Sequence, residues 1–360
     1  VRRDSGLLGG YRTYRETPFG PVPRRARRRA PQDDELLTKI RRGKVISRQS
    51  IKVEEVDVLD SRLRRSTNRV ARLQKRVREE EFIKKEVWGE NLSVLNEETR
   101  KEPLIVRKAL AFKKVLSEMP TEIRQGEVIV GLIRMGSPGM GMPFPEYATE
   151  KEKREAAKKK TSPYSVWGHS VPGYASLLEK GFAGIQEEAN ARLGDLARGD
   201  ENEKRANFHR AVIICYDGLR TLVERYASLA YQLVEQEKDD SRRRELSRIA
   251  ETCKWISENP PRTFCEALQT CWFGHLAFHS TLNFAPVGRF DQYMFPFLQN
   301  DLEKGDLTLE EAQELVDCFW IKFNERDQSA ALSEDHSDPY SFALGGLDKV
   351  RDSRFSTVLM

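Results

Sequence analysis

The sequence has no long apolar run. Its uninterrupted apolar stretches are short, such as Val128-Ile129-Val130, whereas a helix needs roughly 20 apolar residues to cross a bilayer. No apolar stretch near the start resembles a signal peptide. These absences predict a cytoplasmic protein without a membrane partner.

Cysteine is scarce and is not arranged for cross-links or zinc. The five cysteines are an odd number, and none of them forms a CxxC pair, which argues against a disulfide framework or a thiolate zinc site. Cys271, His275 and His279 follow one another at intervals of four, and an i, i+4 pair can chelate a metal. The outer two would lie roughly 12 Å apart on a helix, and large apolar residues surround all three. We therefore interpret them as buried packing residues and expect no metal site.

Composition divides the chain into an arm and a body. Residues 1–50 have few large apolar residues, and they contain Gly9-Gly10, three prolines between positions 18 and 23, and a basic run at 24–29. We expect this segment to be a mobile arm. Residues 51–360 have apolar patterns typical of a globular domain. The chain as a whole is 39% hydrophobic, so simple disorder is excluded.

Positive charge is concentrated in the first quarter of the chain. Residues 1–90 contain 25 Lys and Arg against 14 Asp and Glu, although the whole chain has a net charge of only +5. Clustered guanidinium groups can bind phosphates, yet the basic run has no interleaved aromatic residues and no nucleic-acid-binding motif accompanies it. We therefore expect no nucleic-acid partner. Binding of an acidic protein partner through this basic segment is the alternative.

Helical periodicity dominates the body. Apolar residues at three-to-four spacing predict a series of helices, and Thr308 followed by Glu311 predicts a capping box at the start of one of them. The β-branched run between Gly126 and Gly131 predicts a short buried strand, and residues 340–346 also have strand character. The helices are expected over 57–85, 104–117, 174–196, 204–236, 241–257, 263–278, 290–302 and 308–323.

His169 is the most interesting single residue for chemistry. It precedes a predicted helix start, between Gly168 and Pro172, where a side chain can face a cavity while the helix behind it is rigid. An imidazole titrates near neutral pH and could carry protons there. A purely structural role is the alternative.

Four blocks of sequence together resemble a known family. They are PLIVRKALAFKKVLSEMPTEIRQGEVIVG at 103–131, WGHSVPGYASLL at 167–178, NPPRTFCEALQTCW at 259–272 and GRFDQYMFPFLQNDL at 288–302. The blocks are similar to the amino-terminal half of glycyl radical enzymes, the pyruvate formate-lyase and glycerol dehydratase superfamily. The resemblance runs from about residue 55 to the end, and the Pro-Pro-Arg-Thr-Phe and Gly-Arg-Phe-Asp-Gln-Tyr blocks are the most specific.

The resemblance implies an α/β fold. The chain would be the helix-rich amino-terminal half of a ten-stranded α/β barrel that encloses the active site and excludes water from a radical. In such enzymes a radical-SAM activating enzyme removes hydrogen from a backbone glycine. This glycyl radical generates a thiyl radical on a cysteine, and the thiyl radical takes a hydrogen atom from the substrate. Neither a Gly-Cys-Val-Glu-like loop nor an Arg-Val-x-Gly-Tyr-like loop occurs here. We therefore expect both radical residues to lie beyond Met360 and this chain alone to be inactive and unstable.

The resemblance also suggests residues that contact the substrate. His169 matches a histidine that dehydratase members place beside the substrate. Asn283-Phe284 stands where those dehydratases have a His-Ser pair, and the loss of hydroxyl-binding groups argues against glycerol itself. The arginines that bind a carboxylate in pyruvate formate-lyase have no match here. A diol, a hydroxylated amino acid, an amine or a carboxylate stays open as the substrate.

Two functions follow from the sequence. The first is a formate acetyltransferase- or dehydratase-like glycyl radical enzyme that cleaves a C–C, C–O or C–N bond in a small molecule, with no bound cofactor and as a homodimer when complete. The second is a non-catalytic helical scaffold derived from this fold, which binds an acidic partner through its basic arm.

Overall fold

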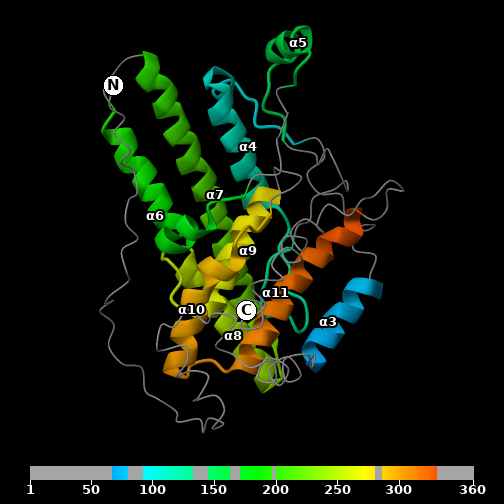
Figure 1. The fold of residues 1–360 in the computed structure, drawn as a ribbon. Coiled ribbons are helices and arrows are strands. Elements are labelled where there is room, and N and C mark those ends of the chain that lie inside the picture. Colours follow the sequence, from blue (N-terminus) through cyan, green and yellow to red (C-terminus); the bar gives the residue numbers. More distant parts are fainter. Residues whose placement is uncertain are drawn as a thin grey trace, which may run out of the picture. The chain divides into compact units, whose positions relative to one another are not determined.

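A computed structural model shows a helical assembly (Figure 1). It describes residues 67–79, 92–132, 145–162, 171–196, 200–279 and 286–330, without the side chains at 78–79, 200–201, 279 and 324–330. All of them belong to the unit Lys44–Met360. The arm at 1–50 and the strand expected at 340–346 fall outside the described residues.

Helices account for most of the described chain, and their positions agree with the apolar periodicity. None of the described helices is long and apolar enough to span a membrane. The elements are α3 (Asn68–Glu79), a short 3-10 helix (Thr99–Lys101), α4 (Leu104–Glu118), α5 (Glu150–Lys158), α6 (Tyr174–Gly194), α7 (Asp200–Gln236), α8 (Asp240–Ile256), α9 (Phe264–His279), α10 (Phe290–Lys304) and α11 (Leu309–Ala330).

Capping residues explain where several helices begin and end. The Asp239 carboxylate accepts a hydrogen bond from the backbone N–H of Arg242 at 2.7 Å and caps α8. Gly305 ends α10 in a left-handed conformation. The predicted capping box between Thr308 and Glu311 is confirmed, because each side chain accepts the other residue's backbone N–H.

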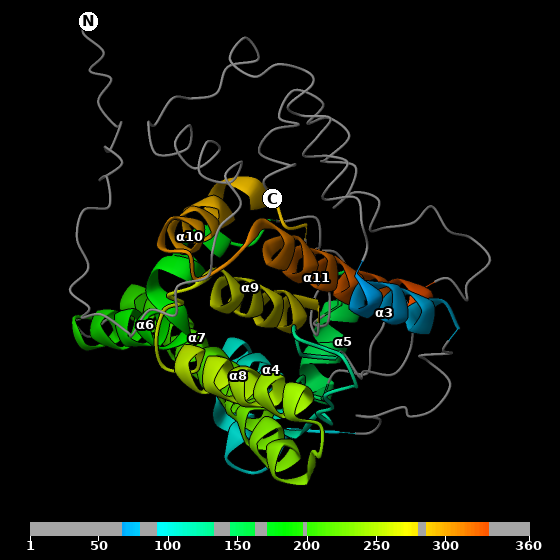
Figure 2. The same cartoon turned by 90° about the horizontal axis from the view of Figure 1, so that it is seen from below.

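Helix α9 is the centre of the packing. It contacts α6, α7, α8, α10 and α11, and Figure 2 shows it between α8 on one side and α10 and α11 on the other. Its composition fits this position, since Phe264, Leu268, Cys271, Phe273 and Leu276 are fully buried. The long helix α7 packs against α4, α6 and α8, and α11 packs against α3.

Helix α6 is kinked at Gly181. This residue has φ 69° and ψ 177°, a conformation open essentially to glycine alone. A Cβ placed there would lie 2.8 Å from the backbone nitrogen of Pro260 and 2.9 Å from the carbonyl of Asn259. The missing side chain therefore lets the Asn259-Pro260 turn contact the helix backbone directly.

The strand expected between Gly126 and Gly131 does not form. The described part of the chain contains one isolated bridge, between Ser93 and Glu146, and no ladder. Instead, the side-chain amide of Gln269 bonds both backbone groups of Val130, at 2.8 and 2.7 Å. A buried extended segment must satisfy its polar backbone, and here helix side chains do so in place of a neighbouring strand.

Helix α5 was not predicted, because its sequence is mostly charged and none of its residues is buried. A capping box between Thr149 and Glu152 defines its start. Arg107 on α4 connects it to the body by an ion pair with Glu152 and a 2.9 Å hydrogen bond to the carbonyl of Tyr147.

Candidate functional site

The three residues predicted to contact substrate lie outside the described residues. His169 falls within residues 163–170, and Asn283 and Phe284 fall within residues 280–285. The structure does describe the residues that flank both segments. These flanking residues show where each segment joins the helical body.

Two tyrosines near the starts of α6 and α10 pack against each other next to α9. Tyr174 is 1% exposed, and its hydroxyl lies 2.9 Å from Nδ1 of His275 on α9. Tyr293 packs its ring centroid 5.7 Å from that of Tyr174 and donates a 2.8 Å hydrogen bond to the carbonyl of Val287. Tyr174 follows the segment 163–170 and Val287 follows the segment 280–285. The tyrosine pair therefore connects the ends of both segments to the same part of α9.

The chain at Gly288 approaches the other segment closely. Gly288 has a φ of +65°, and a Cβ added there would lie 2.5 Å from Cγ1 of Val171. Val171 is the first described residue after 163–170, and Gly288 is the third after 280–285. The two candidate segments therefore enter the described structure side by side.

An aromatic cluster surrounds the imidazole of His275. Trp272 stacks on it with 5.6 Å between ring centroids, and the ring of Phe323 from α11 lies 4.5 Å away. On the other side, Gly274 lets α6 approach, because a Cβ there would lie 2.7 Å from Leu177. The 2% exposure of His275 and the complete burial of Cys271 confirm that these two are packing residues. The side chain of His279 lies outside the described part.

Burial keeps the polar groups protonated where α6, α9 and α10 meet, a place called the junction below. Burial raises the pKa of the Cys271 thiol to about 12, and it also raises the pKa of the hydroxyls of Tyr174 and Tyr293. At neutral pH these groups act as neutral hydrogen-bonding groups and not as nucleophiles.

The other cysteines lie in similar surroundings. All five lie on described helices, and burial raises the thiol pKa of each of them. A reactive cysteine needs a lowered thiol pKa or an exposed, activated position. At neutral pH none of the five is therefore activated as a thiolate nucleophile.

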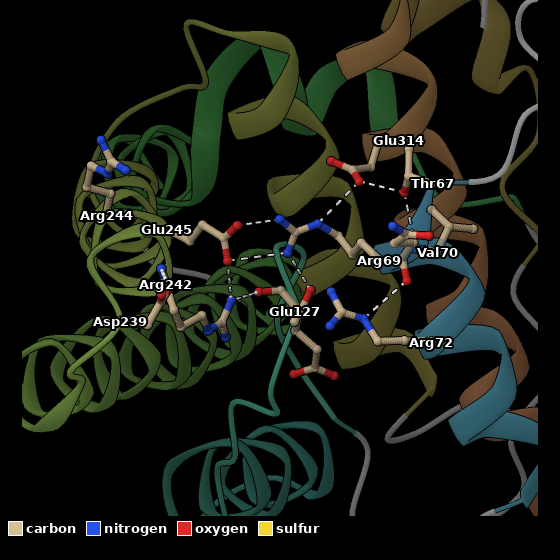
Figure 3. A network of polar contacts seen from close by, with 12 residues as sticks. Thr67, Arg69, Val70, Arg72, Glu127, Asp239, Arg242, Arg244, Glu245 and Glu314 are labelled. Carbon is tan, nitrogen blue, oxygen red and sulfur yellow. Dashed lines mark hydrogen bonds and ion pairs between the residues drawn. The ribbon is translucent and has the colours of Figure 1, made fainter.

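A charged network surrounds the segment that precedes Gly131 (Figure 3). Lys322 on α11 donates a 2.9 Å hydrogen bond to the Glu127 carboxylate, and the two side chains are 2% and 3% exposed. Arg76 on α3 approaches the same carboxylate at 3.6 Å. Burial alone would raise the pKa of Glu127, but Lys322, the backbone N–H of Arg124 and Arg76 outweigh it and lower this pKa.

Arginines bind the backbone carbonyls of the same segment. Arg69 on α3 donates to the carbonyl of Gly126 at 2.8 Å, and Arg242 on α8 donates to that of Glu127 at 2.7 Å. Both arginines also contact the carboxylate of Glu245 (Figure 3). The network therefore joins α3, α8 and α11 around one extended segment. Charge-assisted hydrogen bonds of this kind are stronger than neutral ones.

Sequence reasoning missed Tyr174, Tyr293 and Lys322. The two tyrosines lie inside the blocks WGHSVPGY and GRFDQY, each close to a helix start, and this position is the signal that could have identified them. Lys322 is the single charge in the apolar stretch Phe319-Trp320-Ile321-Lys322-Phe323. A charge there indicates a buried partner.

The arrangement of helices defines the class of protein. It is similar to a glycyl radical enzyme from Archaeoglobus fulgidus, with a TM-score of 0.57 and 26% sequence identity over 72% of this chain and 40% of that chain. The chain belongs to the pyruvate formate lyase-like family, whose model matches residues 63–167 and 165–354. The resemblance seen in the sequence blocks is thereby confirmed.

Curated relatives include lyases and dehydratases. The chain is 39% identical over 161 residues to an isethionate sulfite-lyase of Nitratidesulfovibrio vulgaris, covering 43% of this chain and 19% of the relative. It is 38% identical over 164 residues to a trans-4-hydroxy-L-proline dehydratase of Clostridioides difficile, covering 44% of this chain and 20% of the relative. The matched part thus spans about a fifth of each relative's length.

Proposed function

We propose that this chain is part of a glycyl radical enzyme that cleaves a bond in a small organic substrate after a thiyl radical has removed a hydrogen atom. The observation that carries the proposal is the family match, which extends over most of the body. Within such an enzyme the chain would form the helix-rich, amino-terminal half of the α/β barrel. The radical cysteine and glycine would lie outside this chain, because it contains neither a Gly-Cys-Val-Glu-like loop nor an Arg-Val-x-Gly-Tyr-like loop.

His169, Asn283 and Phe284 would contact the substrate. The close approach of Val171 to Gly288 supports this assignment, because it brings together the flanks of both segments. His169 would carry a proton to or from the substrate. Asn283 would hydrogen-bond a polar group, while Phe284 would exclude water from the radical chemistry.

The substrate would combine a hydroxyl group with an anionic group. The named substrates of the two relatives, isethionate and trans-4-hydroxy-L-proline, both have these features. The amide at Asn283 next to an aromatic ring is less suited to a second and third hydroxyl, so glycerol is disfavoured. Elimination beside a hydroxyl, or cleavage of the bond to the anionic group, would be the reaction.

Two further requirements belong to the proposal. A radical-SAM activating enzyme would install the glycyl radical, and no metal or organic cofactor would stay bound afterwards. The complete protein would be a cytoplasmic homodimer.

The test uses the complete gene product. The full reading frame is first inspected for a Gly-Cys-Val-Glu-like loop and an Arg-Val-x-Gly-Tyr-like loop. The protein is then expressed without oxygen together with its activating enzyme, and the glycyl radical is quantified by electron paramagnetic resonance. Isethionate, trans-4-hydroxy-L-proline and glycerol are supplied separately, with release of sulfite or loss of water as the readout.

A glycyl radical signal with turnover of isethionate or hydroxyproline, and little of glycerol, is the expected result. A reading frame without the two loops, or a protein that never acquires a radical, would reject the enzyme. It would favour the alternative scaffold, which binds an acidic partner through its basic arm.

A further inference from the structure

At the junction of α6, α9 and α10, one side chain contacts the chain in two places, just after residues 163–170 and just after residues 280–285. Tyr293 bonds the carbonyl of Val287 through its hydroxyl and packs against Tyr174 through its ring. Val287 and Tyr174 lie just after the two segments that carry the candidate substrate contacts.

We propose that Tyr293 is a positioning residue, which sets how far apart the chain is held where it enters α6 and where it enters α10. The inference rests on the proposed function, because these entries determine where His169 and Asn283-Phe284 can reach. Tyr293 itself would not touch the substrate.

The hydroxyl of Tyr293 binds a backbone group that the helix cannot satisfy. Helix α10 begins at Phe290, so the carbonyl of Val287 precedes the helix and accepts no hydrogen bond from its ladder. Val287 is 2% exposed, which removes water as an alternative donor. A buried carbonyl without a donor is costly, and the chain at Val287 is therefore held where the Tyr293 hydroxyl can reach it.

The ring of Tyr293 connects the chain at Val287 to the start of α6. It packs against Tyr174, whose own hydroxyl is fixed by the bond to His275. The ring of Phe290 packs edge-on against Tyr293 from the same helix, with 5.8 Å between centroids. The tyrosine is thus restrained on both sides and has little freedom to turn.

The contact between Gly288 and Val171 adds little to this restraint. Gly288 contacts Val171 closely, but Val171 is 57% exposed, so the contact buries little apolar surface and stabilises little. Among the described residues, the other polar group near the Tyr293 hydroxyl is the Cys271 thiol, whose sulfur lies 3.9 Å away. A weak sulfur contact at that distance cannot hold the chain.

The test removes one oxygen atom. Tyr293→Phe is made in the complete protein, with Tyr231→Phe as the matched control, because Tyr231 lies on α7 and is 47% exposed. Hydrogen exchange is measured on the protein before activation, in peptides covering 171–176, 286–292 and, for reference, α8. Radical yield and kcat/KM are measured after activation, with whichever of isethionate or trans-4-hydroxy-L-proline is turned over.

We expect Tyr293→Phe to speed exchange at least tenfold in the peptides 171–176 and 286–292, and to leave α8, the radical yield and the control unchanged. The value of kcat/KM should fall at least tenfold, since small displacements of contacting groups have large effects on rate. Faster exchange with unchanged kcat/KM would make the tyrosine merely structural and overturn the proposal. Unchanged exchange would overturn it as well.

A second variant keeps the proposal testable if Tyr293→Phe folds poorly. Tyr174→Phe removes the bond to His275 on the other side of the junction, and the same exchange and kinetic changes are expected. If the unmodified protein turns over neither substrate, the proposed function has failed. The exchange measurement then still decides whether Tyr293 holds the junction.

Discussion

At the scale of single residues, burial decides what a group can do in this protein. The cysteines and tyrosines around α9 are protonated because they are buried, and they serve as packing and hydrogen-bonding groups. We propose that His169 carries a proton because it precedes the start of α6 and matches a histidine of the dehydratases; the first residue of that helix, Tyr174, bonds His275. A reactive side chain next to a rigid anchor is well suited to proton transfer.

His169→Gln should therefore impair catalysis without affecting activation. In the activated complete protein we expect the radical yield to stay at the level of the unmodified protein, while turnover falls about 10²-fold or more, the usual size of a general acid–base contribution. Electron paramagnetic resonance and product formation measure the two quantities. Unchanged turnover would show that the histidine is structural, and a lost radical signal would point to folding or activation.

Asp301 should make stability depend on pH. Its carboxylate is 5% exposed and accepts the backbone N–H of Phe264 at the start of α9 at 2.8 Å. Burial nevertheless raises its pKa to about 6. Because the folded pKa lies above the unfolded one, this group favours the folded state at low pH, and that stability is lost as the pH rises from about 4 through 6.

Asp301→Asn removes the buried charge and keeps an oxygen that can accept the same N–H. We expect the variant to be more stable than the unmodified protein at pH 8, by about 1 kcal/mol or more. This advantage should vanish near pH 4. Chemical unfolding of both proteins at the two pH values measures it, and an Asn variant that is less stable at pH 8 would show that the charge is needed at the helix start.

At the scale of elements, the apolar periodicity predicted α4 and α6 to α10 nearly to their ends, because one-sided burial leaves a clear three-to-four pattern. It predicted the start of α11 but ended this helix at 323, whereas α11 runs to Ala330. It could not predict α5, which buries none of its residues. The strand at 126–131 was wrong because a β-branched run shows that a segment is buried, but not what binds its backbone. The partners, Gln269 and Arg242, lie more than a hundred residues away in sequence.

The residues of the candidate site could be predicted only where the sequence matches, or directly adjoins, the blocks that resemble the family. His169 lies inside the block 167–178 and Asn283-Phe284 precede the block 288–302, and the roles of all three stay predictions. The kink in α6 left no signal in the periodicity, since one glycine inside a helical pattern is common and usually unremarkable. Glycine is required at position 181 because the backbone of Asn259-Pro260 packs directly against it. This is a contact between distant parts of the chain.

Gly181→Ala should therefore be strongly destabilising. The new methyl group would face backbone atoms at 2.8 Å, and the conformation itself costs a non-glycine residue about 1–3 kcal/mol. We expect a loss of about 3 kcal/mol in the free energy of unfolding. Gly194→Ala is the matched control, since it lies at the end of the same helix with nothing within 4 Å of a new Cβ, and it should be neutral or slightly stabilising. Equal effects of the two changes would contradict the role assigned to the kink.

At the scale of the whole molecule, the Glu127–Lys322 pair connects parts of the chain that are far apart in sequence. Lys322→Met leaves the Glu127 carboxylate buried with weaker partners, and breaking a buried pair in this way costs about 3–5 kcal/mol. We expect a loss of that size in chemical unfolding of the complete protein. The double variant with Glu127→Gln should recover part of it, because the unpaired charge is gone. A double variant as unstable as the single one would show that Lys322 acts through packing alone.

The same pair has a consequence for the time at which this protein can fold. Glu127 and Lys322 are separated by 195 residues, and a ribosome adding 5–20 residues per second needs roughly 10–40 s to synthesise them. During that interval Glu127 has been made but Lys322 has not, and α11, which closes the buried network from one side, does not yet exist. The segment around Glu127 therefore cannot settle in its final surroundings early in translation, and the growing chain depends on water, or on a chaperone, to accommodate this charge until α11 emerges.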